Sequence, residues 1–231
     1  MRKLAVFVEG QTELYFLQRL LQELAGYQRI NIRLERKIGN GIISLKSTSA
    51  NTGEETYSAL VYDCQGEGSV KTAIQERIAD LHSKGYDTIL GLRDLYPLDL
   101  ADRKKLIKGA NENLGHAGMT VRIIIAVMEI EAWFLKEDLH FIRLHPSLTV
   151  AHINASCGFN PKTADITKVR RPSALLNQIY QLVGRQYKKR YKHAQRTAAL
   201  LDYDNLYVEV TKQVESLAVF LEYIDRFLVP V

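Results

Sequence analysis

The stretch Lys3–Glu13, KLAVFVEGQTE, predicts a strand followed by a helix at the start of this 231-residue chain. Five consecutive apolar residues, Leu4–Val8, are typical of a strand that is buried on both faces. Gly10 permits a tight turn after that strand. The apolar positions of residues 11–26 then recur near the 3.6-residue period of a helix: Leu14, Leu17, Leu20, Leu21 and Leu24. A strand that passes into an amphipathic helix is the repeating unit of a parallel α/β sheet.

The same alternation continues through the first half of the chain. Strand patterns cover residues 30–38, 58–63, 86–92 and 119–128, and helical patterns cover 70–85, 101–115 and 129–139. The polar residues 39–56 between two of the strands are predicted to form a long loop or flap. We therefore predict an α/β, Rossmann-like, mainly parallel sheet flanked by helices.

The pattern changes after residue 144. Residues 145–172 have weak periodicity and three prolines, which predicts a linker or irregular lobe, whereas residues 173–228 are helical by periodicity. We expect an α/β catalytic domain over residues 1–144 and, over 145–231, a linker and basic helical region that packs on it.

The composition is that of an ordinary globular protein, with 46% hydrophobic and 25% charged residues. No apolar run approaches the roughly eighteen residues of a membrane span, and the first run is too short for a signal peptide. Cys64 and Cys157 provide neither a disulfide framework nor a zinc-ligand spacing. We expect a cytoplasmic protein without a membrane partner.

Acidic residues follow three of the predicted strands: Glu9, Asp94 and Glu129. Because the carboxyl ends of parallel strands share one edge of the sheet, these residues are expected to converge there as a catalytic metal site. Glu131 competes with Glu129 as a ligand, since the two side chains share a face in a strand but diverge in a helix. Second-choice site residues are Glu13, Asp63, Asp99 and Arg93.

Two of these residues have structural alternatives. Glu13 lies in a first helical turn, where it either orients the site or caps the helix. Arg93 either contacts a scissile phosphate or forms an ion pair with Asp94.

A basic stretch between Lys162 and Arg196 contains ten Lys and Arg residues and one acid, Asp165, in a chain of net charge +5. Such a stretch attracts phosphate, although a solvated basic helix face explains it equally well. Tyr187 and Tyr191 lie among these cations, where they either stack bases or pack together on one helical face. The expected nucleic-acid contacts are Arg170, Arg171, Lys188, Lys189, Arg190 and Lys192.

The glycine-rich stretch Gln65–Thr72 is a second candidate for phosphate binding. Gly66 and Gly68 would let the backbone approach a phosphate that Lys71 holds. The spacing matches neither a P-loop nor a dinucleotide fingerprint. A plain loop with Ser69 as the helix N-cap is the simpler interpretation.

The string VEGQTE, Val8–Glu13, resembles the opening motif of the Toprim fold, which topoisomerases, primases, recombination mediators and the overcoming-lysogenization-defect nucleases share. The resemblance implies that Glu9 is a general acid or base and that Asp94 is the first acid of a magnesium-binding Asp-x-Asp motif. Tyr96 stands where the second aspartate of that motif is expected.

The whole chain also looks like a Toprim-like group called domain of unknown function 4276. The resemblance rests on VEGQTE, RDLY (93–96), MEIEAWF (128–134), RRPSALL (170–176) and YKKRYKHA (187–194). It implies a fold and a metal site but no substrate.

These features predict a nuclease that uses Mg²⁺ or Mn²⁺ to hydrolyse nucleic-acid phosphodiesters, in phage defence or in DNA or RNA processing. The Toprim resemblance adds a separate ATPase as an expected partner. The alternative is a Toprim-like module that binds nucleic acid or protein without cutting it, which Tyr96 favours. A small-nucleotide phosphotransferase that uses Gly66–Thr72 is a third hypothesis.

Overall fold

The computed structural model describes residues 1–39, 41–48, 53, 55–66 and 68–229. Its centre is a six-stranded sheet of order β3-β2-β4-β1-β5-β6, in which β3 is antiparallel and the other pairs are parallel. The strands are β1 (Arg2–Val8), β2 (Ile30–Ile38), β3 (Gly41–Thr48), β4 (Tyr57–Asp63), β5 (Thr88–Asp94) and β6 (Thr120–Ala126). The predicted Rossmann-like, mainly parallel sheet is confirmed.

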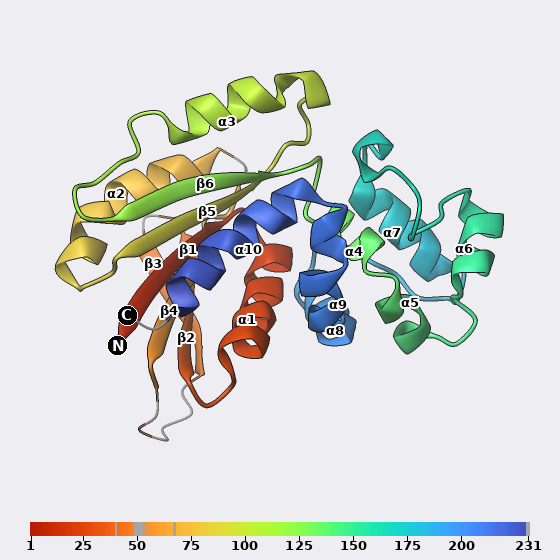
Figure 1. The fold of residues 1–231 in the computed structure, drawn as a ribbon, viewed down its shortest axis with the longest axis horizontal. Coiled ribbons are helices and arrows are strands. Elements are labelled where there is room, and N and C mark those ends of the chain that lie inside the picture. The colour runs from red at the N-terminus through yellow and green to blue at the C-terminus, as the bar shows by residue number, and fades with distance from the viewer. Residues whose placement is uncertain (40, 49–52, 54, 67, 230–231) are drawn as a thin grey trace.

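Helices cover both faces of the sheet (Figure 1). Alternate residues of β1 point to opposite faces, so that Leu4 and Val6 join one apolar cluster and Ala5 and Phe7 join the other. The first cluster includes α1 (Gln11–Ala25) and α10 (Glu215–Leu228), and the second includes α2 (Ser69–Ser83) and α3 (Arg103–Asn111). Burial on both faces explains why the β1 sequence is continuously apolar.

The prediction of a flap over residues 39–56 was wrong where the structure describes the segment. Gly41–Thr48 forms β3, which pairs antiparallel with β2 at the sheet edge. The polar composition suggested a loop, but a strand at the edge of a sheet does not need a continuous apolar run. Residues 40, 49–52 and 54 of the expected flap lie outside the described residues, as does residue 67 of the glycine-rich stretch.

The predicted linker over residues 145–172 contains a helix, which corrects that interpretation. Thr149 caps α6 (Val150–Cys157) by accepting a hydrogen bond from the backbone of His152, and Gly158, with φ of +64°, ends it. Ile153 is the one residue of α6 that is buried, so the helix leaves little apolar periodicity in the sequence.

The C-terminal part is less uniformly helical than its periodicity predicts. Residues 183–190 form no helix, because Gly184 adopts φ of +68° after the end of α7. Lys188, Lys189 and Arg190 therefore lie in a loop, not on a basic helix face. The helices after β6 are α4 (Glu131–Lys136), α5 (Leu139–Leu144), α6, α7 (Pro172–Gln181), α8 (Tyr191–Leu200), α9 (Tyr203–Val208) and α10. Short 3-10 turns lie at Leu100–Asp102, between β5 and α3, and at Ile166–Lys168 and Val210–Lys212.

The helices that follow β6 share the apolar cluster of β1 and α1. Phe16 of α1 contacts Trp133 of α4 and Tyr203 of α9, and Trp133 contacts Phe220 of α10. The core therefore crosses residue 145. Figure 1 shows α4 to α7 gathered beyond the ends of β5 and β6, where the candidate site lies.

Both cysteines are free thiols. Among the described residues, no helix is both long and apolar enough to span a membrane.

Candidate acidic site

Three neighbouring strands bring acidic residues to one edge of the sheet. Asp94 is the last residue of β5, Glu9 follows β1 directly, and Glu129 follows β6 after a short turn. Since β5 pairs with both β1 and β6, the three carboxyl ends lie side by side.

The side chains of Asp94, Glu129 and Glu131, here called the acid triad, each place an oxygen within 4.8 Å of the others. Met128 adopts a left-handed φ of +59°, which turns the chain sharply after β6. The backbone N–H of Ile130 then donates to Asp94 Oδ1 at 2.9 Å. This turn lets both glutamates face Asp94, so the predicted competition between Glu129 and Glu131 does not arise.

Lys189 lies among the three acids. Its Nζ is 3.1 Å from Asp94 Oδ2, 3.2 Å from Glu129 Oε1 and 3.3 Å from Glu131 Oε2. The acids are buried, whereas the lysine side chain is 40% exposed and enters from the loop before α8. Sequence reasoning assigned Lys189 to nucleic acid and missed this contact, although buried carboxylates require a compensating cation.

The C-terminal part of the chain also holds the triad through neutral donors. Ser173, near the start of α7, donates to Glu129 from its backbone N–H at 2.7 Å and from its hydroxyl at 2.9 Å. The Tyr187 hydroxyl donates to Glu131 Oε1 at 2.6 Å and is itself 3.2 Å from Thr12 Oγ1. Glu131 Oε2 is buried and receives no hydrogen bond.

Glu9 and Glu13 extend the triad into an acid cluster of five buried carboxyl groups. Glu9 is not among the acids whose oxygens gather within 4.8 Å, but its Oε1 lies 3.6 Å from Arg93 Nε. Arg93 therefore pairs with Glu9, and the predicted pairing with Asp94 was wrong. Glu13 is in the first turn of α1, where it is buried instead of acting as an exposed cap.

Burial and mutual repulsion shift the protonation of the cluster. Burial, reinforced by the charge of Asp94, raises the pKa of Glu9 to about 9 and that of Glu13 to about 8. Burial raises the pKa of Asp94 to about 7 against the opposing effect of Lys189, and it also raises the pKa of Glu131. Burial alone would lower the pKa of Lys189, but the charges of Glu131, Asp94 and the other acids outweigh it and raise that pKa.

The acid triad has the properties of a divalent-cation site. It offers oxygen ligands that lie together at a buried strand edge, where the ammonium group of Lys189 contacts all three acids. The five carboxyl groups of the cluster outnumber its two cationic side chains, Lys189 and Arg93, and the raised pKa values of Glu9 and Glu13 favour protons on those two groups. The arrangement can therefore hold a metal ion or protons.

Two second-choice acids lie outside the cluster. Asp63 is fully buried, but it pairs with Arg36 at 2.8 Å and accepts from the backbone of Gln65 at 3.0 Å. Asp99 is exposed and pairs with Arg170 on the surface. Asp63 was predicted because it ends an apolar run and Asp99 because it is the next acid after Tyr96, but each pairs with an arginine away from the cluster.

The residues expected to contact phosphate are divided between several places. Arg171, Lys188 and Lys189 line a hollow of about 200 Å³ beside the acid triad. Arg190 and Lys192 are exposed near the start of α8, and Arg170 is engaged by Asp99. Tyr187 and Tyr191 do not pack together on one helical face as one interpretation predicted. Tyr187 is buried against Glu131, whereas the side chain of Tyr191 is 50% exposed.

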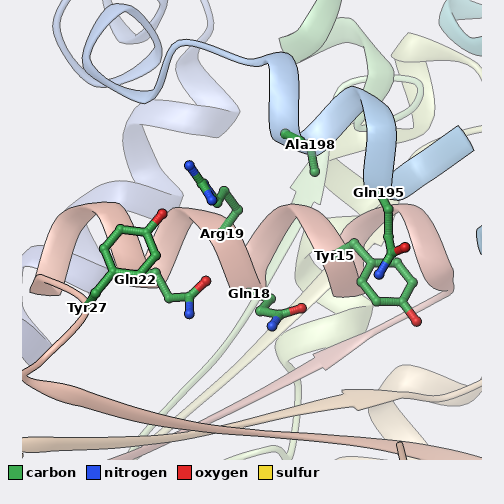
Figure 2. A pocket seen from close by; sticks show the side chains of 8 residues that line it. Tyr15, Gln18, Arg19, Gln22, Tyr27, Gln195 and Ala198 are labelled. Carbon is green, nitrogen blue, oxygen red and sulfur yellow. The ribbon is translucent and has the colours of Figure 1, made fainter. Parts of the chain in front are cut away.

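Tyr191 lies next to a groove between α1 and α8, because it contacts Tyr15, which lines that groove. Its ring meets that of Tyr15 edge-on, with centroids 5.2 Å apart. Figure 2 shows Tyr15, Gln18 and Gln22 of α1 along this groove with Gln195 of α8, and the space measures about 370 Å³.

The glycine-rich stretch follows β4 and leads into α2. Gly66 donates its N–H to the backbone oxygen of Glu9 at 3.0 Å, and Lys71 donates to the backbone oxygen of Gly109 at 2.7 Å. Ser69 does not act as the predicted N-cap, since it is the first helical residue and its hydroxyl donates to Gly66 and Cys64 carbonyls.

The fold and the acid triad define an α/β protein with a candidate metal site at the carboxyl ends of its strands. A family model described as "domain of unknown function (DUF4276)" matches residues 8–217, and the chain belongs to this family. The match includes every residue of the acid cluster and Lys189. No curated protein matches the chain significantly.

Proposed function

We propose that the protein is a Mg²⁺- or Mn²⁺-dependent hydrolase of nucleic-acid phosphodiesters and that the acid cluster is its active site. The observation that carries the proposal is the convergence of Asp94, Glu129 and Glu131, which are buried and place their carboxylate oxygens within 4.8 Å of one another. Buried carboxylates are costly without partners, so such an arrangement is typical of functional sites. Asp94, Glu129 and Glu131 would hold the ion, which would polarise the phosphate and lower the pKa of an attacking water.

Glu9 is suited to proton transfer instead of metal binding. Burial, reinforced by the charge of Asp94, raises its pKa to about 9 and so favours the protonated form. A protonated carboxyl beside the reacting phosphate can donate its proton to the departing oxygen. Arg93, which lies 3.6 Å from Glu9, would then face the negative charge of the phosphate.

Two features favour a nucleic-acid substrate over a small phosphoester. Arg171 and Lys188 border the hollow beside the triad, and the exposed Tyr191 packs against Tyr15, which lines the α1–α8 groove. Cations neutralise a phosphate backbone and exposed aromatic rings stack on bases. The Toprim resemblance of Val8–Glu13 supports the same function, and in this proposal Glu131 takes the place of the aspartate missing at Tyr96.

Cleavage assays with variants of the triad test the proposal. DNA and RNA, single- and double-stranded, are incubated with the wild type, Asp94→Asn and Glu131→Gln in Mg²⁺ or Mn²⁺. We expect each variant to lose activity by about 100-fold or more. Asp99→Asn is the matched control, because Asp99 pairs with Arg170 outside the cluster, and it should retain activity within about twofold.

Two outcomes would contradict the active-site assignment. Cleavage that survives Asp94→Asn would remove the acid cluster from catalysis. Absence of cleavage on all substrates, together with salt-dependent binding of nucleic acid, would instead support the module that binds without cutting. The phosphotransferase hypothesis, a role in phage defence and an ATPase partner remain predictions from the sequence.

A further inference from the structure

A second cavity lies next to the acid cluster, between α2, the end of β5 and α3. Its volume is about 480 Å³, which is within the range of pockets for small ligands. Three cationic side chains line it, Lys71, Arg93 and Lys105, against one carboxyl group, that of Asp102, among its described residues.

The two lysines of this cavity are available to a ligand. Lys71 donates to a backbone oxygen, that of Gly109, and no ion pair within 4.0 Å links Lys71 or Lys105 to a described carboxylate. The lysines that do form such pairs in the described part of the chain lie elsewhere: Lys84, Lys162, Lys168, Lys189 and Lys212. Uncompensated cations around a concave surface attract an anion.

The remaining walls fit an apolar group attached to that anion. Leu98 and Leu106 line the cavity with Ala110, and Leu98 is 39% exposed. A planar base or a sugar ring can cover such a surface while the lysines contact phosphate oxygens.

We infer that this cavity binds a nucleoside phosphate, with Lys71 and Lys105 on the phosphate and Leu98 and Leu106 against the nucleoside. The ligand is either a free nucleotide or one nucleotide unit of a longer strand, since both present the same groups. Arg93 borders the cavity and contacts Glu9, so the bound phosphate lies beside the acid cluster. Binding here does not require hydrolysis or a metal ion.

Binding measurements in EDTA at low salt test the inference separately from the proposed activity. The probes are AMP, adenosine, and a 5′-phosphorylated single-stranded hexanucleotide, with affinities determined by calorimetry. We expect at least one phosphorylated probe to bind more tightly than adenosine. Lys71→Glu and Lys105→Glu should each weaken that binding by about tenfold.

Lys104→Glu is the matched control, because it makes the same charge change on α3 at a residue that does not line this cavity. It should change affinity by less than about twofold. AMP binding that depends on both lysines identifies a free-nucleotide site, and dependence confined to the hexanucleotide identifies a strand-binding site.

Equal effects of Lys104→Glu and the cavity variants would overturn the inference, as would failure of both AMP and the hexanucleotide to bind more tightly than adenosine. Thermal unfolding of each variant verifies that it is folded. If one of the two lysine variants does not fold, the other one is sufficient for the test. Asp94→Asn should retain this binding even if it abolishes cleavage, so failure of one proposal is distinguishable from failure of the other.

Discussion

Lys189 contributes a single cation to three buried carboxylates at distances of 3.1 to 3.3 Å. Replacement by methionine would leave those charges without that partner. We expect Lys189→Met to lower the free energy of unfolding in EDTA by about 1–3 kcal/mol, less than for a fully buried pair because the side chain is 40% exposed. Added Mn²⁺ should reduce this loss by supplying the missing positive charge.

Urea unfolding with and without Mn²⁺ measures both effects. Lys188→Met is the control, since Lys188 is exposed and forms no ion pair with a described residue. An equal loss in both variants, or a loss that Mn²⁺ does not change, would contradict the role of Lys189 as a counter-charge.

The raised pKa values of Glu9 and Glu13 make the free energy of unfolding decrease as pH rises. Burial and the charge of Asp94 raise their pKa values to about 9 and about 8 from an ordinary 4.5, so the folded protein holds protons that the unfolded chain releases. Stability is then greatest below about pH 4.5, as far as these groups determine it, and falls as pH rises toward 9.

We therefore expect the free energy of unfolding in EDTA to decrease between pH 6 and pH 9. Glu9→Gln, which removes one of these protons, should flatten the slope and raise stability at pH 8 by about 1 kcal/mol. Denaturant titrations at several pH values test this, and a slope identical in wild type and Glu9→Gln would contradict it. Greater stability with lost activity would be consistent with a site built for function.

The sequence was sufficient to predict Asp94 and Glu129 as neighbours, because strand ends and parallel topology fix their positions. It could not predict which cations face them. Lys189 is nearly a hundred residues from Asp94 and reaches it through a loop, while Arg93 turns toward Glu9 instead of its neighbour Asp94. Such contacts depend on tertiary packing, which residue type and spacing do not encode.

Among the elements, β5 depends on a glycine where α2 approaches the sheet. A Cβ on Gly91 would lie 2.7 Å from Ile123 Cγ1 and 2.9 Å from Val70 Cγ1, closer than real contacts allow. Since Asp94 ends the same strand, a shift there would also displace the acid triad.

We expect Gly91→Ala to lower the free energy of unfolding by about 1–3 kcal/mol through overpacking. Gly109→Ala is a control with the opposite sign, because Gly109 lies inside α3 with no described atom near its added Cβ. It should stabilise the protein by up to about 1 kcal/mol. Denaturant unfolding distinguishes the two, and an unchanged stability in Gly91→Ala would show that α2 moves aside at little cost.

Elements were predictable where a single periodicity governs them. The long helix α1 and the apolar strands β1 and β6 follow directly from their patterns. The edge strand β3 and the short helix α6 did not, because an exposed edge and a helix with one buried residue leave weak apolar signals. The loop over residues 183–190 was read as helix because its neighbours are helical, and the basic residues within it were consequently misplaced.

At the scale of the whole molecule, the sheet and the C-terminal helices complete one another. Phe220 and Phe227 of α10 are almost fully buried in the cluster that contains β1 and α1. Tyr57 of β4 donates its hydroxyl to Leu228 at 2.6 Å, and Arg2 donates to Val229 at 2.7 Å. The acid triad likewise needs Lys189 and Ser173 from beyond residue 144.

We therefore expect the fragment 1–144 to lack cooperative unfolding when it is expressed alone, because removing α6 to α10 exposes the apolar side of the sheet. Circular dichroism during thermal and urea titration measures this against the full chain. Coexpression of 1–144 with 145–231 is the matched control. The two pieces together contain every residue of the core and lack only the peptide bond between residues 144 and 145. Cooperative unfolding of 1–144 alone, at a midpoint near that of the full chain, would show that the α/β part is an independent domain and that the helices add only the residues they contribute to the acid triad.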